Sequence, residues 1–306
     1  MNGQNSSQAI STTHVPTKQH FIRGVWFMIL SLSLFATNVL ILKYVGSNRH
    51  VSPWSALYVR AVIGFIVSVL LLREQGGVDF KPIYSDPLMI WRGLTGFVGT
   101  AIFYWTIPIL GAGKSTLIGS IYIPFAAVLA VFLLKERLGW DRVIWIMLSL
   151  VGVLMLTGVG ESFWQGKFHM TVPEMLALLA ALVSAASVII IRRLTRRHHS
   201  GSIYLCQCIY LVLPLTPFAF FSMEWPGMFE MGLISLAALA AGFGHIAMNE
   251  GYRFLPVATG ASTQMVLPVM ASIGGVVLFA EHFTGIQLTG AVLIVTGCYW
   301  VVAGRR

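Results

Sequence analysis

Two stretches of the chain, one near the end of each half, share an arrangement of proline, glutamate and glycine within apolar sequence. The shared residues are Pro124, Glu136 and Gly152 in the first half and Pro268, Glu281 and Gly297 in the second. The glutamate and the glycine are 16 residues apart in both stretches, and the proline-to-glutamate spacing differs by one residue. Such self-similarity indicates an internal duplication. A chance likeness between apolar runs is the alternative.

The apolar runs recur along the chain at the length that a lipid bilayer requires. The sequence is 57% hydrophobic and 10% charged, whereas soluble domains are about 25% charged. A run of about 20 apolar residues crosses a hydrocarbon core of about 30 Å. We therefore predict an all-α membrane protein with ten transmembrane helices in two inverted five-helix repeats. The spans are expected near residues 22–42, 53–72, 91–110, 115–134, 143–159, 172–191, 203–222, 231–252, 257–280 and 284–303.

These spans divide the chain into a tail and two repeats. Residues 1–21 are polar and are expected to form a disordered cytoplasmic tail, followed by a first repeat over 22–160 and a second over 172–303. The first apolar run is longer than the core of a signal peptide and has no clear cleavage site, so we expect it to be retained. Thr284 and Gln287 form a possible capping box for the last helix, and Asp141 is its expected counterpart in the first half.

The distribution of positive charge predicts the orientation. Since each repeat has five spans, the second must enter the membrane from the opposite side. With the N-terminus inside, 15 lysines and arginines, Arg92 among them, fall on cytoplasmic segments and 4 fall outside. This asymmetry follows the positive-inside rule and predicts a plasma membrane protein of the bacterial inner-membrane type, with both termini cytoplasmic and the Glu281 segment external. The basic cluster over 192–199 is interpreted as an orienting loop rather than as a site for anionic lipid or nucleic acid.

Few residues suggest enzyme or cofactor chemistry. Cys206, Cys208 and Cys298 all lie in apolar segments, without the spacing of a disulfide framework or a metal site. The segment 111–116 resembles the end of a phosphate-binding loop, but Pro108 stands where that motif needs its first glycine. We therefore expect no metal, no cofactor and no enzymatic activity.

The two predicted repeats resemble those of a known family. Two five-helix repeats, each with a proline-bearing fourth helix that runs into Glu136-Arg-Leu-Gly or Glu281-His-Phe and then a helix with a late glycine, are similar to the EamA-type permeases of the drug/metabolite transporter superfamily. The resemblance covers about residues 22–303, and the second repeat departs from the pattern at His282 and Phe283. It implies a secondary transporter of amino acids and their derivatives, vitamins, drugs or similar metabolites, mostly outward.

Inverted repeats place the substrate near the middle of the bilayer, where ionisable residues are functional by default. Arg60 lies in the second span, and the family commonly has an arginine there; a structural role with backbone carbonyls is the alternative. Gln207 follows Ser202 by five residues, as Arg60 follows Ser55. This equal spacing suggests a polar position preserved through the duplication.

The eighth span carries the other ionisable candidates. His245, Asn249 and Tyr252 are spaced by four and three residues, so they share one helical face. His245 or Glu250 is predicted to release a proton as cargo binds, because both groups can titrate near neutral pH. The alternative is that Glu250 pairs with Arg253 at the inner surface. Further cavity candidates are Asn38, Tyr104, Tyr122 and Gln264.

The sequence thus predicts a secondary transporter that works by alternating access and exports a small metabolite or drug, such as an amino-acid derivative or a vitamin, across the plasma membrane. A membrane scaffold or receptor that does not transport, and a membrane-embedded enzyme, are the alternatives. The expected partners are a small-molecule substrate and the lipid bilayer, without nucleic acid, and a homodimer is left open.

Overall fold

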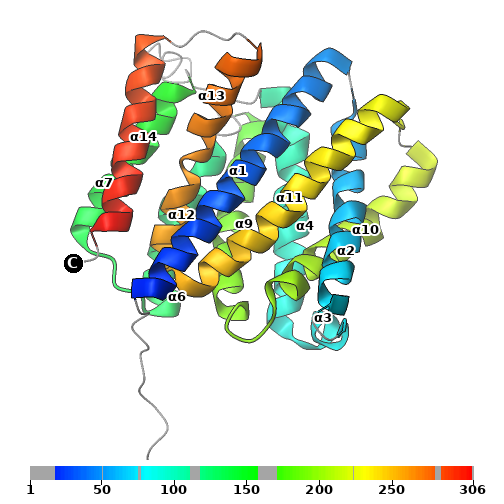
Figure 1. Ribbon diagram of the computed structural model, residues 1–306, viewed down its shortest axis with the longest axis horizontal. Coiled ribbons are helices and arrows are strands. Elements are labelled where there is room, and N and C mark those ends of the chain that lie inside the picture. Colours follow the sequence, from blue (N-terminus) through cyan, green and yellow to red (C-terminus); the bar gives the residue numbers. More distant parts are fainter. Residues whose placement is uncertain are drawn as a thin grey trace, which may run out of the picture.

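The computed structural model describes residues 18–49, 51–74, 77–110, 118–157, 171–222, 224–279 and 284–304. Throughout these residues the regular structure is α-helix, with no strand (Figure 1). This outcome confirms the predicted all-α class. It follows from the bilayer, in which a helix is one of the few ways to satisfy every backbone N–H and C=O group internally.

The helices follow the expected order of spans. The first repeat contains α1 (Lys18–Arg49), α2 (Pro53–Glu74), α4 (Pro87–Leu110), α6 (Tyr122–Leu134) and α7 (Trp140–Leu156), with the short α3 (Lys81–Ser85) between α2 and α4. The second contains α9 (Val172–Leu194), α10 (Ser200–Ser222), α11 (Met228–Phe254), α12 (Val257–Gln264) with α13 (Leu267–Phe279), and α14 (Gly285–Ala303).

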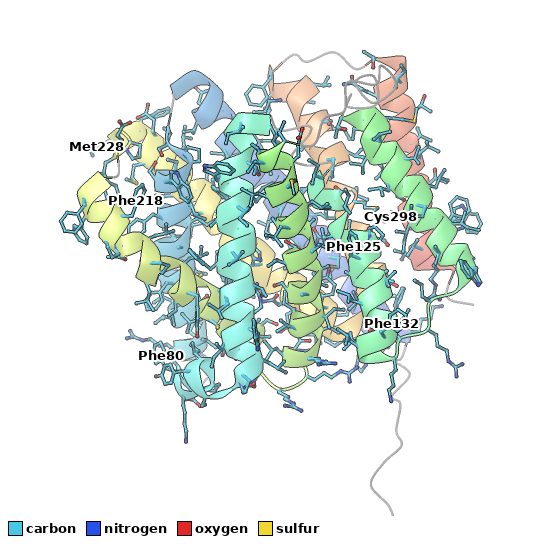
Figure 2. The ribbon with its side chains drawn as sticks, turned by 180° about the vertical axis from the view of Figure 1, so that it is seen from behind. Phe80, Phe125, Phe132, Phe218, Met228 and Cys298 are labelled. Carbon is cyan, nitrogen blue, oxygen red and sulfur yellow. The ribbon has the colours of Figure 1, made fainter. Side chains whose placement is uncertain are left out.

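Among the described helices, seven segments are long and apolar enough to cross a membrane, and Ile118–Leu134 is a shorter apolar segment. The membrane class is therefore confirmed, whereas the count of ten spans stays a prediction. The helix α1 begins at Lys18, inside the tail predicted over 1–21; residues 1–17 lie outside the described part. Large apolar side chains face outward, including Phe132 at 75% exposed and Phe125 at 39%, both labelled in Figure 2. An apolar exterior of this kind fits lipid rather than water.

The two repeats pack with one another in a symmetric pattern. The helix α1 packs along α11, and its counterpart α9 packs along α4; α2 packs on α10, and α7 on α14 (Figure 1). The start of α1 lies beside the end of α11, where Gly24 faces Leu255. The end of α9 lies there too, because Arg192 donates to the carbonyl of Tyr252. The helices α1 and α9 therefore run in opposite directions, as inverted repeats require.

The repeated prolines mark breaks in the fourth helix of each repeat. In the second repeat the span predicted over 257–280 corresponds to an apolar segment, Val257–Phe279, that is long enough to cross a membrane, and a turn at Met265 and Val266 divides it into α12 and α13. Pro268 is the second residue of α13, where its missing N–H costs nothing. Pro124 occupies the first turn of α6, just after a turn residue at Ile121.

The repeated glycines hold α7 and α14 together. A Cβ atom on Gly152 would lie 2.7 Å from the carbonyl oxygen of Gly290 and 2.9 Å from Ile294. A Cβ atom on Gly297 would lie 2.8 Å from the carbonyl oxygen of Trp145. Only glycine allows this close approach of two backbones, so the shared pattern marks the contact between the last helices of the repeats.

Helix caps give one confirmation and one correction. Thr284 and Gln287 form the predicted capping box at the start of α14. Asp141 does not cap α7, because that helix is preceded by Gly139 and has no side-chain cap hydrogen bond. Asp141 instead lies in the first turn, where its negative charge is favourable near the positive end of the helix dipole.

Candidate functional site

Arg60 is the centre of a polar group between α2, α4 and α11. It lies seven residues after Pro53, the first residue of α2, and therefore about 10 Å from that end of the helix at 1.5 Å per residue. Its Nη1 donates to the hydroxyl of Tyr104 at 3.0 Å, and its guanidinium carbon lies 5.7 Å from the centre of the Tyr104 ring. Its Nη2 lies 2.6 Å from Nε2 of His245. Two of the predicted site residues thus meet at Arg60.

The imidazole of His245 is held by aromatic rings as well as by Arg60. The ring of Tyr204 stacks on it at 5.0 Å between centroids, and the ring of Phe35 meets it edge-on at 4.9 Å. Since a guanidinium has only donors, Nε2 of His245 must be the acceptor, and the proton of this neutral imidazole is on Nδ1. Nδ1 is buried and has no hydrogen-bond partner among the described residues.

Among the described residues, no carboxylate balances the charge of Arg60. The ion pairs found between described residues join other side chains, and no Asp or Glu of that part of the chain pairs with Arg60. An arginine near the centre of a membrane costs about 2.5–3.5 kcal/mol on insertion scales. The hydrogen bonds that Arg60 donates to a phenol and to a neutral imidazole offset part of this cost but leave a net positive charge. The arrangement is suited to an anionic group such as a carboxylate.

A second polar group lies between α4 and α10 and was missed by the sequence-based prediction. Arg92 was counted there as a cytoplasmic loop charge, but it is 2% exposed and lies within α4. Its Nη2 donates to the side-chain oxygen of Gln207 at 2.6 Å, and the Gln207 amide donates to Thr100 at 3.2 Å. The predicted span began at residue 91, so Arg92 stood at its very end. Because α4 begins at Pro87, Arg92 lies in the second turn of an apolar helix, and this was the signal that was missed.

The remaining interior candidates lie apart from Arg60. Asn38 on α1 donates to the carbonyl of Ala237 on α11 at 2.8 Å and so joins two helices. Tyr122 and Tyr252 pack in one apolar cluster, where the buried Tyr252 hydroxyl has no hydrogen-bond partner among the described residues, and Gln264 lies 3.6 Å from the sulfur of Met28. These side chains are engaged in contacts between helices, and no contact joins them to the group around Arg60.

Asn249 and Glu250 lie at the end of α11. Asn249 donates to the carbonyl of Ser200 at 3.2 Å. Glu250 accepts from the Ser200 hydroxyl at 2.7 Å and lies 3.4 Å from Arg253. The contact between Glu250 and Arg253 is therefore present, whereas its location at the inner surface and a role of Glu250 in proton transfer stay predictions.

A network of charged residues closes the same end of the bundle, which we call the basic end: the face formed by the start of α1 and the ends of α6, α9 and α11. Glu136 follows α6 and accepts from the backbone N–H of Val257, the first residue of α12, at 2.9 Å. Arg192 at the end of α9 lies 3.6 Å from Glu136. Burial raises the pKa of Glu136 above its ordinary value, and the Val257 N–H and the Arg192 charge offset only part of that rise. Its counterpart Glu281 lies outside the described residues.

A second ion pair at the basic end joins α4 to the connection between the two repeats. Nε2 of His198 lies 3.0 Å from a carboxylate oxygen of Asp86, next to the start of α4. Partial burial raises the pKa of Asp86, but hydrogen bonds from His198 and from the Leu88 N–H outweigh this and hold the pKa below its ordinary value. The carbonyl of His198 accepts from Arg253 at 3.0 Å. These contacts hold the basic end together across both repeats.

Within the described part of the chain, no three His, Cys, Asp or Glu side chains form a group that could hold a metal ion.

Comparison with known proteins gives the family context. The family described as the EamA-like transporter family matches residues 22–158 and again residues 172–303. The two matches coincide with the two repeats. A solved crystal structure superimposes with a TM-score of 0.74 at 18% identity, covering 92% of this chain and 96% of the other. This likeness shows a shared fold.

Three curated relatives have transport named in their descriptions. An S-adenosylmethionine uptake transporter of Rickettsia prowazekii is 22% identical, with 94% of each chain covered. A pseudopaline exporter of Pseudomonas aeruginosa is 22% identical, over 90% of this chain and 94% of the relative. A probable amino-acid metabolite efflux pump of Salmonella typhimurium is 27% identical, over 74% and 80%.

Proposed function

Since the chain belongs to the EamA-like transporter family, we propose that it is a secondary transporter of a small metabolite that carries a carboxylate group. Members of the family are transporters, so the chain is not classed as an enzyme. The substrate and the direction of transport are our proposals.

The observation that carries the proposal is the unbalanced guanidinium of Arg60. Its partners are Tyr104 and the neutral ring of His245, and no protein carboxylate pairs with it in the described part of the chain. A substrate carboxylate would supply the missing charge through a planar, two-pronged hydrogen bond. S-adenosylmethionine and amino acids, which appear in the descriptions of two relatives, carry such a group.

We propose an alternating-access cycle in which the conformation described here is the state that is closed at the basic end. The ion pairs Arg192–Glu136 and His198–Asp86 both lie there. Arg60, about 10 Å from the opposite end of α2, is partly exposed. Opening of the basic end would then require these ion pairs to separate while the opposite end closes.

For orientation we propose that the basic end is cytoplasmic, in the plasma membrane of a bacterial-type cell, with both termini inside and export as the physiological direction. Positive charge at one end of a membrane protein favours the cytoplasmic side. Two of the three relatives described above are named as an exporter or an efflux pump.

Reconstitution into proteoliposomes tests the proposed function. Purified protein should accelerate release of radiolabelled S-adenosylmethionine or of labelled amino acids from preloaded vesicles, and an excess of the unlabelled compound should compete. Vesicles without protein are the control. If the protein moves none of these compounds but binds one of them, the alternative of a receptor is supported; chemical conversion of a compound would instead support an enzyme.

A further inference from the structure

Arg92 is a buried cation and, after Arg60, the second interior arginine for which the described residues offer no counter-charge. It lies five residues after Pro87, the first residue of α4, and therefore about 8 Å from the basic end of that helix. Its partner Gln207 is a neutral amide. Its Nε is buried with no hydrogen-bond partner, and no Asp or Glu pairs with it in the described part of the chain.

The surroundings of Arg92 leave room for its side chain and aim it at the neighbouring helix. A Cβ atom on Gly96, one turn further along α4, would lie 2.5 Å from Nη1 of Arg92 and 2.8 Å from Gln207. Glycine at this position therefore admits both polar side chains between α4 and α10. A purely structural arginine would be expected to bond backbone carbonyls, whereas the partner seen here is a side chain on another helix.

The Arg92 group and the Arg60 group are related by the inverted repeat. Gln207 lies seven residues after Ser200, the first residue of α10, as Arg60 lies seven residues after the first residue of α2. Arg60 connects α2 to α11, and Gln207 connects α10 to α4, which is the equivalent pair of helices. Because the repeats are inverted, Arg60 lies in one half of the membrane and Gln207 with Arg92 in the other.

The two groups lie close together along α10. The ring of Tyr204 stacks on His245 of the Arg60 group, and Tyr204 lies three residues before Gln207 of the Arg92 group on the same helix. Their exposure differs, since Arg60 is partly exposed and Arg92 is 2% exposed. This difference matches the closure of the basic end, because Arg92 is the group on that side.

We propose that Arg92 and Gln207 form a second carboxylate-binding station in the half of the membrane nearer the basic end, and that cargo passes between Arg92 and Arg60 during transport. This inference rests on the proposed function. When the basic end opens, the separation of Asp86 from His198 frees the start of α4, and Arg92 becomes the first cation that cargo meets from that side. When the opposite end opens, Arg60, which is already partly exposed in this structure, is the accessible cation.

The test measures transport from each face separately, with radiolabelled S-adenosylmethionine and a labelled amino-acid mixture as probes. Inside-out and right-side-out vesicles present the two faces. We expect Arg92→Gln to raise the half-saturating concentration at the basic end by about 10-fold or more, as for loss of a charged hydrogen bond, and to leave that of the opposite face within about twofold. Arg92→Lys, which keeps the charge but not the planar fork, should have an intermediate effect. Arg142→Gln, at the basic end but bonded to the carbonyl of Gly304, is the matched control.

The thermal unfolding temperature of each variant checks its folding. Binding is measured in the purified wild-type protein as protection of Arg92 from modification by phenylglyoxal, which mass spectrometry detects. Protection by the transported probe supports the station even where a variant folds poorly. Equal effects of Arg92→Gln on both faces, or none on either, with transport by the wild-type protein intact, would overturn the second station alone. Failure of the wild-type protein to move any probe would refute the proposed function itself.

Discussion

Nη2 of Arg60 lies 2.6 Å from Nε2 of His245, across the contact between α2 and α11 and 185 residues apart in the chain. Because a guanidinium donates only, this contact requires a bare Nε2 and therefore a neutral imidazole. The geometry links the charge of Arg60, the protonation of His245 and the packing of two helices.

Replacement of Arg60 tests its role as an anchor for the carboxylate. We expect Arg60→Gln to lower transport about 10- to 100-fold, as for loss of a hydrogen bond to a charged group. Arg60→Lys should restore only part of the rate, since lysine lacks the planar fork. Initial rates in proteoliposomes are the measurement. If Arg60→Ala expresses normally and transports at the wild-type rate, Arg60 is neither an anchor nor a support of the site.

The order of the helices could be predicted because an apolar run long enough to cross the bilayer has few other structures available to it. The interruption at Met265 was harder to foresee, because a proline near the start of a helix and a proline within one look alike in sequence. Asp141 was wrongly predicted to cap α7. The residue that precedes this helix is Gly139, which has no side chain and therefore gives no capping signal in the sequence.

The site was predicted only in part. Arg60, Tyr104 and His245 were each identified, since polar groups within apolar spans are conspicuous, but their meeting depends on the packing of α2, α4 and α11. Arg92 was counted with the charges of the cytoplasmic segments because the predicted span began at residue 91, whereas α4 begins at Pro87, and hydropathy does not locate the end of a helix within a turn. In the eighth span, His245 lies in the interior and Glu250 lies at the basic end. This difference depends on where α11 ends, which the spacing of residues on one helical face does not predict.

Packing of α7 on α14 gives a prediction on stability. Gly152→Ala should destabilise the protein by about 1–3 kcal/mol, as for other overpacked contacts, because the new methyl group meets backbone atoms of Gly290 and Ile294. The thermal unfolding temperature in detergent should fall. Gly232→Ala is the matched control, since nothing lies within 4 Å of a Cβ atom there. An equal response of the two variants would show that the glycine contact is not tight.

Orientation is tested by cysteine labelling in intact cells. His199 is exposed at the basic end, and Met228 is 96% exposed at the start of α11. The native cysteines Cys206, Cys208 and Cys298 are buried, so background labelling should be low. A membrane-impermeant maleimide should label Met228→Cys in intact cells and His199→Cys only after permeabilisation. The reverse pattern would invert the proposed topology.

The Asp86–His198 pair predicts a dependence of stability on pH. The pKa of Asp86 is lower in the folded protein than its ordinary value, so its ionised form stabilises the fold. That contribution is complete above the unfolded pKa of about 3.9 and is lost as the pH falls through the lower folded value. The difference in unfolding temperature between wild type and Asp86→Asn should therefore be steady above about pH 5 and shrink below about pH 4.

Asp79→Asn, at an exposed aspartate upstream of α3, is the control for the Asp86 measurement and should show a smaller difference. A gap for Asp86→Asn that persists unchanged to the lowest pH at which the protein stays folded would show that the charge of Asp86 contributes nothing to stability.

Coupling of transport to protons is the prediction that depends most directly on the contact between Arg60 and His245. A proton on Nε2 of His245 excludes the hydrogen bond from Arg60, because neither nitrogen could then accept. Protonation of His245 would therefore break a link between α2 and α11, which provides a physical route from a proton to a helix rearrangement. Glu250 lacks such a route, since Ser200 and Arg253 hold it at the basic end.

The expected result is that a pH gradient alone drives cargo against its concentration gradient in proteoliposomes. His245→Ala should abolish this drive while exchange of labelled for unlabelled cargo continues, because exchange needs the binding site but no net movement of protons. Glu250→Gln, matched as a change at an ionisable group of the same helix, should retain the drive. Loss of the drive in Glu250→Gln alone would transfer the role to Glu250. Accumulation by both variants at the wild-type level would show that α11 carries no coupled proton, and that transport proceeds by exchange or facilitated diffusion.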